Sequence, residues 1–224
     1  IPLSIFETNS YLLKNHQINL IEYASFFGSI QVLRYLYMNN VELNHSMWYY
    51  SIHGKNPEII HFLEENKIEP FFGTYAGILI ESIKCHHNEF VEYIQINLLN
   101  NTNLNFLSIC RKYYNYYFFP DELEIDSNIF YEFCQFDFIS IVDLILNNDD
   151  VNLNDLNSYI EIKKYYFPFD EVKIKQTPCH AAIQKGNLEI VEMLLKKLNF
   201  FYINNKISYK SKKRSSNYEK TPLS

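Results

Sequence analysis

Short amphipathic segments recur along the chain, and each predicts an α-helix. Over residues 188–198, apolar side chains stand at intervals of four and then three or four residues, which is the period of one helical face. Pro178 and Gly186 precede this segment, and they are typical of the start and the end of a shorter helix. The pattern over 177–198 therefore predicts two short helices joined by a tight turn.

The same two-helix pattern returns upstream. In each second helix an apolar pair is followed, four residues after its first member, by leucine or isoleucine. The pairs begin at Val32, Ile59, Phe90, Ile141 and Ile190, which are 27, 31, 51 and 49 residues apart. The same spacing, applied to the first helix of each unit, predicts N-caps at Asn19, Ser46, Gly77, Asn128 and Thr177. Two positions after each predicted N-cap stands an apolar residue: Ile21, Trp48, Leu79, Phe130 and Cys179. Internal repetition of this kind is typical of stacked repeat arrays.

The best-formed unit resembles the ankyrin repeat. Its opening, Thr177-Pro-Cys-His-Ala-Ala, is similar to the family signature T-P-L-H-x-A, and Gly186 closes its first helix. The stretch from about residue 20 to 146 also resembles an ankyrin-like domain of unknown function found in expanded families of protist parasites. The turn glycine is kept at Gly28 and is replaced by Lys55, His86 and Asp137. The resemblance implies an all-α solenoid of five degenerate ankyrin-like repeats and a non-catalytic protein-binding function.

The repeat spacing also predicts the domain organisation. The third interval is long enough for an inserted segment near 98–127, whose aromatic run over 113–119 favours an extra packed helix over a loop. Since the chain begins without methionine and ends on a repeat opening, we expect a piece of a longer protein. The expected parts are a preceding helix or cap over 1–18, degenerate repeats over 19–153, an enlarged finger hairpin over 154–176, the well-matched repeat over 177–199, a basic linker over 200–220 and the start of a further repeat at 221–224.

Composition and charge exclude several classes of protein. With 47% hydrophobic and 21% charged residues, the chain is expected to fold, and it has no apolar run long enough to predict a membrane span. Four cysteines, 24 to 45 residues apart and without a CxxC pair, predict reduced thiols in an intracellular, cytoplasmic protein. Residues 206–220 carry six basic side chains and one acidic one, whereas the rest of the chain has a net charge of −11. The basic segment is interpreted as a linker or as an address for nuclear import.

Three motifs raise the question of chemistry. Cys179 and His180 are adjacent, but neighbouring side chains on a helix point about 100° apart, and Cys179 belongs to the apolar column. Cys85-His86-His87 offers metal-ligand types, yet no second pair stands at the spacing of a closed site, so a polar turn is favoured. Trp48 also lies in the apolar column, which favours core packing over a binding hot spot. We therefore expect no catalytic residue, no metal site, no cofactor and no small-molecule substrate.

The resemblance places partner binding on the concave side of the array, at finger loops and first-helix faces. Acidic finger bases favour a protein partner with a basic surface. Two of the predicted residues, Tyr49 and Tyr131, occupy the same repeat position as His180, so a structural hydrogen-bonding role is the competing interpretation for them. Three alternatives stay open: the regulatory region of an enzyme whose catalytic domain lies elsewhere, a structural spacer, and a nucleic-acid-associated protein using residues 206–220, which the acidic remainder disfavours. The predicted binding residues are Glu42, Glu69, Asp149 and Asp150 at the finger bases, with Tyr49 and Tyr131 on first helices.

Overall fold

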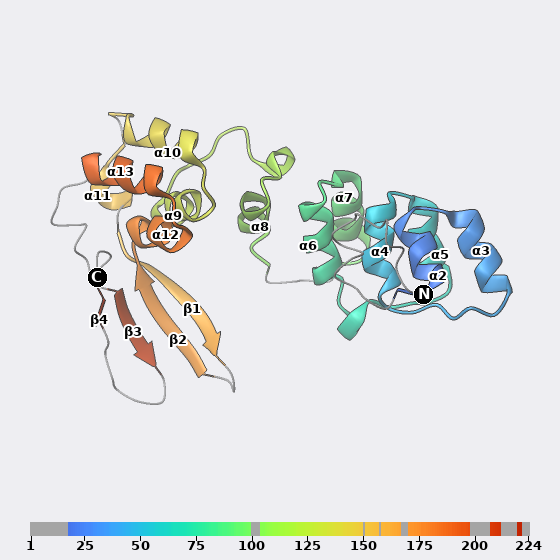
Figure 1. Ribbon diagram of the computed structural model, residues 1–224. Helices are drawn as coiled ribbons and strands as arrows, with labels where there is room; N and C mark the ends of the chain where they lie inside the picture. The colour runs from blue at the N-terminus through green and yellow to red at the C-terminus, as the bar shows by residue number, and fades with distance from the viewer. Residues whose placement is uncertain are drawn as a thin grey trace. The chain divides into compact units, whose positions relative to one another are not determined.

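The computed structural model contains two compact units, residues 1–118 and 119–224, and each is described by itself. The boundary falls inside the block of repeats expected over 19–153, so the single continuous solenoid stays a prediction. The mostly helical fold is confirmed (Figure 1). The structure describes residues 18–99, 104–149, 151–156, 158–166, 170–197, 207–211 and 219–220, and the expected segments before residue 18 and after residue 220 lie outside these ranges.

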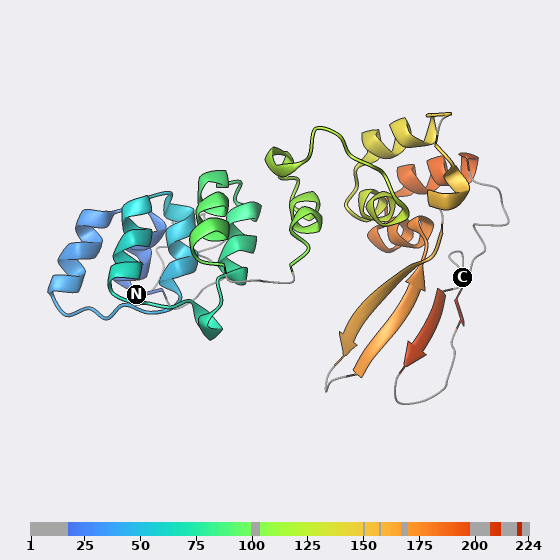
Figure 2. The ribbon, with the colours of Figure 1, turned by 180° about the vertical axis from the view of Figure 1, so that it is seen from behind.

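Unit 1 is built from antiparallel helix pairs that follow one another along the unit (Figures 1 and 2). The first helices of successive pairs pack on each other, because each has an apolar side that is covered only by its neighbours. The first helices are α2 (Leu20–Phe26), α4 (Met47–Gly54), α6 (Ala76–Lys84) and α8 (Phe106–Lys112); their partners are α3 (Ile30–Met38), α5 (Pro57–Glu65), α7 (Asn88–Asn97) and the 3₁₀ turn η2 (Tyr116–Phe118).

The two helices of each pair are joined through one residue in the left-handed conformation. Gly28 has φ 67°, and the residues that replace glycine adopt the same conformation, with φ 53° at Lys55, 56° at His86 and 62° at Asp137. A side chain in this region costs about 1–2 kcal/mol, so the turn geometry is maintained by packing and not by local preference. The repeat register that aligned these residues with Gly28 and Gly186 is confirmed.

The apolar column predicted for the first helices forms the core. Its members Ile21, Trp48, Leu79, Phe130 and Cys179 are all at most 2% exposed. Trp48 also satisfies its polar atom, since its Nε1–H donates to the Ile68 carbonyl at 2.6 Å. The interpretation of Trp48 as a core residue is therefore confirmed.

Two of the five predicted N-caps are wrong by two residues. α6 begins at Ala76 behind Tyr75, whereas Gly77 was expected to cap it, and Gly77 lies where an added Cβ would overlap the Tyr49 hydroxyl. α9 (Ser127–Gln135) begins one residue before Asn128, because the Asp126 carboxylate accepts the Ile129 N–H at 2.8 Å and provides an earlier cap. Asn19 and Thr177 form capping boxes, and Ser46 is the N-cap of α4 without a side-chain cap bond.

The inserted segment is itself a shortened helix pair, and its helix α8 confirms the extra helix expected within 98–127. This helix ends at Lys112, before the aromatic run, and the run forms a left-handed turn at Tyr114 (φ 56°) and then η2. Asn115 follows the turn and donates through Nδ2 to the Ile83 carbonyl at 3.1 Å, much as Asn56 after the Lys55 turn donates to the Gly28 carbonyl at 2.8 Å. These matching bonds identify α8 and η2 as one more degenerate repeat.

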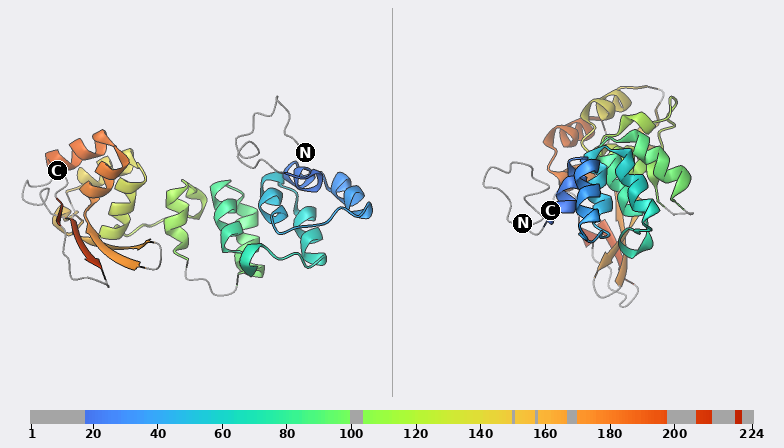
Figure 3. Two further views of the ribbon diagram at one scale, coloured as in Figure 1. Left: turned by 60° about the horizontal axis from the view of Figure 1, so that its bottom comes forward. Right: turned by 90° about the vertical axis from the view of Figure 1, so that its right-hand side faces the viewer.

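Unit 2 combines two helix pairs with a sheet. The α9/α10 pair packs on the α12/α13 pair around fully buried Phe130, Phe133 and Leu194. The strands are antiparallel in the order β1-β2-β3-β4 (Figure 3). The remaining elements are α10 (Ile139–Leu146), α11 (Leu153–Leu156), β1 (Ile160–Tyr166), β2 (Asp170–Gln176), α12 (Pro178–Lys185), α13 (Leu188–Lys197), β3 (Ile207–Ser211) and β4 (Glu219–Lys220).

The β1/β2 hairpin is the enlarged finger expected over 154–176, whereas the further strands of the sheet lie where a linker was expected. Strands β3 and β4 lie within 200–220, and β3 pairs with β2 of the finger hairpin. In β3, Ile207 and Tyr209 alternate with Ser208 and Lys210, which is the period of a strand. The linker was predicted from the basic charge of this segment, without use of that alternation.

Candidate functional site

Two of the predicted binding residues lie on neighbouring fingers of unit 1. Glu42 is exposed in the loop between α3 and α4, and Glu69 is exposed in the loop between α5 and α6. His45 connects the loops, because its Nδ1 contacts the Glu69 carbonyl and its ring lies 5.7 Å from the ring of Phe71. Phe71, in the 3₁₀ turn η1 (Phe71–Gly73), is 49% exposed. These four residues form what we call the finger surface of unit 1.

Of the other predicted residues, Tyr49 belongs to unit 1, and Tyr131 and Asp149 belong to unit 2. Tyr49 is half-buried, with its hydroxyl against Gly77. Tyr131 is 3% exposed in unit 2, and its hydroxyl donates to Gln176 Oε1 at 2.7 Å, which fits the structural hydrogen-bonding role that competed with binding. Asp149 is exposed in unit 2, and Asp150 lies outside the described residues.

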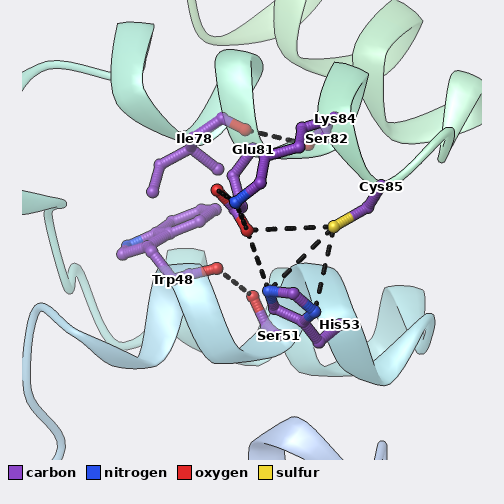
Figure 4. Close-up of polar contacts among 8 residues, drawn as sticks. All are labelled: Trp48, Ser51, His53, Ile78, Glu81, Ser82, Lys84 and Cys85. Atoms are coloured by element: carbon purple, nitrogen blue, oxygen red, sulfur yellow. Dashed lines mark hydrogen bonds and ion pairs between the residues drawn. The ribbon is translucent and has the colours of Figure 1, made fainter. Parts of the chain in front are cut away.

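Three side chains that can act as metal ligands, His53, Glu81 and Cys85, lie together between α4 and α6 (Figure 4). His53 Nε2 is 3.0 Å from Glu81 Oε1, and Cys85 Sγ is 3.9 Å from the same oxygen and 4.0 Å from His53 Nε2. His53 comes from the last turn of α4, Glu81 from α6, and Cys85 is the C-cap residue of α6. This is the one group of three or more possible metal ligands among the residues that the structure describes.

Surrounding residues hold the cluster in place. The ring of Phe26 stacks on the His53 imidazole at 5.1 Å and 23°. Lys84 Nζ lies 3.3 Å from both carboxylate oxygens of Glu81. The nearby hydroxyls of Ser51 and Ser82 donate to carbonyls of their own helices, so they do not compete for the carboxylate (Figure 4).

The electrostatics of the cluster favour an ionised Glu81 and a neutral Cys85 thiol. The hydrogen bond with His53, assisted by Lys84, lowers the pKa of Glu81. Burial, assisted by the Glu81 charge, raises the pKa of the Cys85 thiol to about 11. A catalytic cysteine needs the opposite shift, because the thiolate is the nucleophile. Cys85 beside His53 therefore does not resemble an activated nucleophile, although thiol, imidazole and carboxylate are all present.

A cavity of about 420 Å³ lies on the turn side of unit 1, and its lining includes Lys55, His86, His87, Phe90 and Tyr117. Burial lowers the pKa of His87 to about 4, and the positive charges of Lys55, His53 and His86 act in the same direction. His87 is therefore neutral at physiological pH. The expected polar turn of Cys85-His86-His87 thus lines a cavity with its two histidines and turns its cysteine toward His53.

Unit 2 carries a row of lysines across its sheet. In the strand register Lys173 of β2 lies opposite Lys163 of β1 and opposite Lys210 of β3, so the three positions share one face. Glu161 pairs with Lys173 at 2.5 Å, and Lys163 and Lys175 are exposed. Residues 119–159, by contrast, contain ten acidic residues and no lysine or arginine. The charge of unit 2 is therefore strongly divided between its helices α9 to α11 and its strands.

The sequence motifs pointed to Cys85 but missed His53 and Glu81. A search for metal ligands along the sequence compares residues a few positions apart, whereas His53 is 32 residues from Cys85. A usable signal was present in the repeat register, because it places the C-terminal ends of neighbouring first helices side by side. His53 stands two residues before the turn residue Lys55 at the end of α4, and Cys85 stands one residue before the turn residue His86 at the end of α6.

Comparison with known proteins assigns one part of the chain to a family. Residues 175–205 match the ankyrin-repeat family model, so the chain carries an ankyrin repeat that contains α12 and α13. No curated protein and no solved structure matches the chain. Ankyrin repeats generally mediate protein–protein interaction, and the family is typically non-catalytic. Among the described residues, no helix has the length and apolar character needed to cross a membrane.

Proposed function

We propose that the chain is a protein-interaction module and that the finger surface of unit 1 binds a partner with a basic surface. The observation that carries this proposal is that two neighbouring fingers expose Glu42, Glu69 and Phe71. The match of residues 175–205 to the ankyrin-repeat family supports it independently. Loops on a rigid helical scaffold are common binding sites, and an exposed aromatic residue on a surface that also exposes acidic residues resembles a hot spot with a charged rim. The contacts of His45 support a fixed arrangement of the two fingers.

Reversing the finger charges is expected to weaken partner binding without unfolding the protein. In the double variant Glu42→Lys/Glu69→Lys, Kd for a basic partner should rise at least about tenfold, and the wild-type affinity should fall as salt rises. The partner would be captured from the source cell with the full chain, purified, and titrated against each variant. Melting temperatures should agree within the range of ordinary surface substitutions.

Glu65→Lys provides the control for each single reversal, because it makes the same charge change as Glu69→Lys alone, four residues away at the exposed end of α5. It should leave Kd nearly unchanged, and Phe71→Ala should weaken binding in the same direction as the double variant. If the double variant binds the purified partner as the wild type does, the finger surface is not the binding site.

A second candidate function is binding of a nucleic acid by the sheet of unit 2. The specific observation in its favour is the exposure of Lys163 and Lys175 on the same face of the β1/β2 hairpin as Lys173, which is itself paired with Glu161. Exposed Lys163 and Lys175 would then contact phosphates and release counterions. The acidic stretch 119–159 opposes this binding, which is why it ranks second.

Removal of two lysines tests this candidate. Lys163→Gln/Lys175→Gln should reduce affinity for a single-stranded oligonucleotide. The negative slope of log affinity against log salt concentration should become shallower by about one to two. Lys185→Gln/Lys197→Gln removes two exposed lysines from α12 and α13 and should have a smaller effect. Equal effects of the two double variants would indicate nonspecific attraction, and no binding by the wild type would exclude the candidate.

A further inference from the structure

We propose that His53, Glu81 and Cys85 form a binding site for a divalent transition-metal ion, with Zn²⁺ as the best match. The three side chains offer a nitrogen, an oxygen and a sulfur ligand, and their nearest ligand atoms lie within 4.8 Å of one another. The proposal does not depend on the finger surface, because it concerns the ends of α4 and α6.

The distances between the three ligand atoms lie within about 0.7 Å of those around a tetrahedral ion. Zn²⁺ binds imidazole nitrogen and carboxylate oxygen at roughly 2.0–2.2 Å and thiolate sulfur at roughly 2.3 Å, which places tetrahedral ligands about 3.3–3.6 Å apart. His53 Nε2, Glu81 Oε1 and Cys85 Sγ are separated by 3.0, 3.9 and 4.0 Å. Small side-chain movements therefore suffice to place all three around one ion.

The choice of metal follows from the ligand types. Thiolate and imidazole together select zinc and its neighbours among the transition metals, whereas magnesium and calcium prefer sites built from oxygen alone. When the ion binds, the thiol proton of Cys85 leaves to solvent and the sulfur becomes a thiolate ligand. The protein supplies three ligands, so a fourth position is open to water or to a side chain of a partner.

The surroundings resemble the outer shell of a metal site. The Phe26 ring fixes the plane of the His53 imidazole. Glu81 faces the other two ligands through Oε1, and Oε2 lies 3.3 Å from Lys84 Nζ, so the carboxylate can ligate through one oxygen while the lysine holds the other. The side chain of Lys84 is 46% exposed, so it can move away from Oε1 without leaving a buried charge.

Metal titration of the 224-residue chain tests the proposal. The reduced, chelator-treated protein would be titrated with Co²⁺ and, in competition with a chromophoric chelator, with Zn²⁺. We expect one ion per chain, a thiolate-to-cobalt charge-transfer band, and a higher unfolding temperature in the presence of Zn²⁺. Cys85→Ser should abolish the band, and Cys85→Ser and His53→Gln should each raise Kd at least about tenfold.

His61→Gln is the matched control. His61 pairs with Glu64 at 3.1 Å, so it is also an imidazole beside a carboxylate, but the pair is not part of a three-ligand group in the described ranges. This variant should bind the ion as the wild type does. The substitutions in Cys85→Ser and His53→Gln affect different repeats. Circular dichroism would show which of these variants is folded, and the folded one is used to judge the change in Kd. The proposal is overturned if the wild type shows no saturable binding, or if a folded ligand variant keeps the wild-type affinity.

Discussion

Replacement of Gly54 by alanine is expected to destabilise unit 1 by about 2–4 kcal/mol, although alanine is the better helix former. Gly54 is the last residue of α4, where the backbone of the preceding repeat approaches closely. An added Cβ would overlap the Ser25 carbonyl oxygen and lie 2.8 Å from Gly28 N and 3.0 Å from Gly28 Cα. Because all of these atoms belong to the backbone, the overlap can be relieved only by moving α2 away from α4.

Denaturant unfolding followed by tryptophan fluorescence provides the measurement. Trp48 is the single tryptophan of the chain and is buried in unit 1, so its emission reports on this unit. Gly73→Ala is the control, because Gly73 has φ 61° and a Cβ there would meet only the Glu69 carboxylate, at 3.6 Å. It should cost about 1–2 kcal/mol from backbone strain alone. If Gly54→Ala is as stable as the wild type, the close contact between the α2 and α4 repeats is wrong.

The parts of the fold that were predicted from the sequence are those specified within one repeat. The burial of the apolar column from Ile21 to Cys179 could be predicted, because each member is the same number of residues from an N-cap and from a turn. Stacked repeats bury equivalent positions. The turn position of Lys55 followed from the same register, although lysine rarely adopts a positive φ. Repetition thus supplied information that the local preference of this residue contradicts.

The parts that were missed depend on contacts between distant segments. The α8 repeat escaped detection because its second helix is reduced to a 3₁₀ turn and has no apolar pair to align. Strand β3 is defined by its pairing with β2, more than thirty residues earlier. The candidate metal site combines both difficulties, since His53 and Cys85 become neighbours only when α4 packs against α6.

Shortening Leu194 to alanine should destabilise unit 2 by about 2–5 kcal/mol, the range for a large-to-small change in a packed core. Leu194 is 0% exposed on α13 and belongs to the core shared by the two helix pairs of this unit. The cost arises from the lost apolar contacts and from the cavity that the neighbouring helices cannot fill. Lys196 lies two residues further on the opposite side of α13, 76% exposed, with only a 4.0 Å contact to Glu192.

The comparison of these two positions tests the helical register of the ankyrin repeat. Lys196→Ala should change stability by no more than about 0.5 kcal/mol, because exposed i,i+4 pairs contribute little. Urea unfolding followed by circular dichroism, with hydrogen exchange of peptides from α12 and α13, would assign the loss to unit 2. Faster exchange of these peptides is expected in Leu194→Ala alone. Equal losses at both positions would mean that α13 buries a different face, and the repeat alignment that begins from Ile190 and Leu194 would have to be shifted along the whole chain.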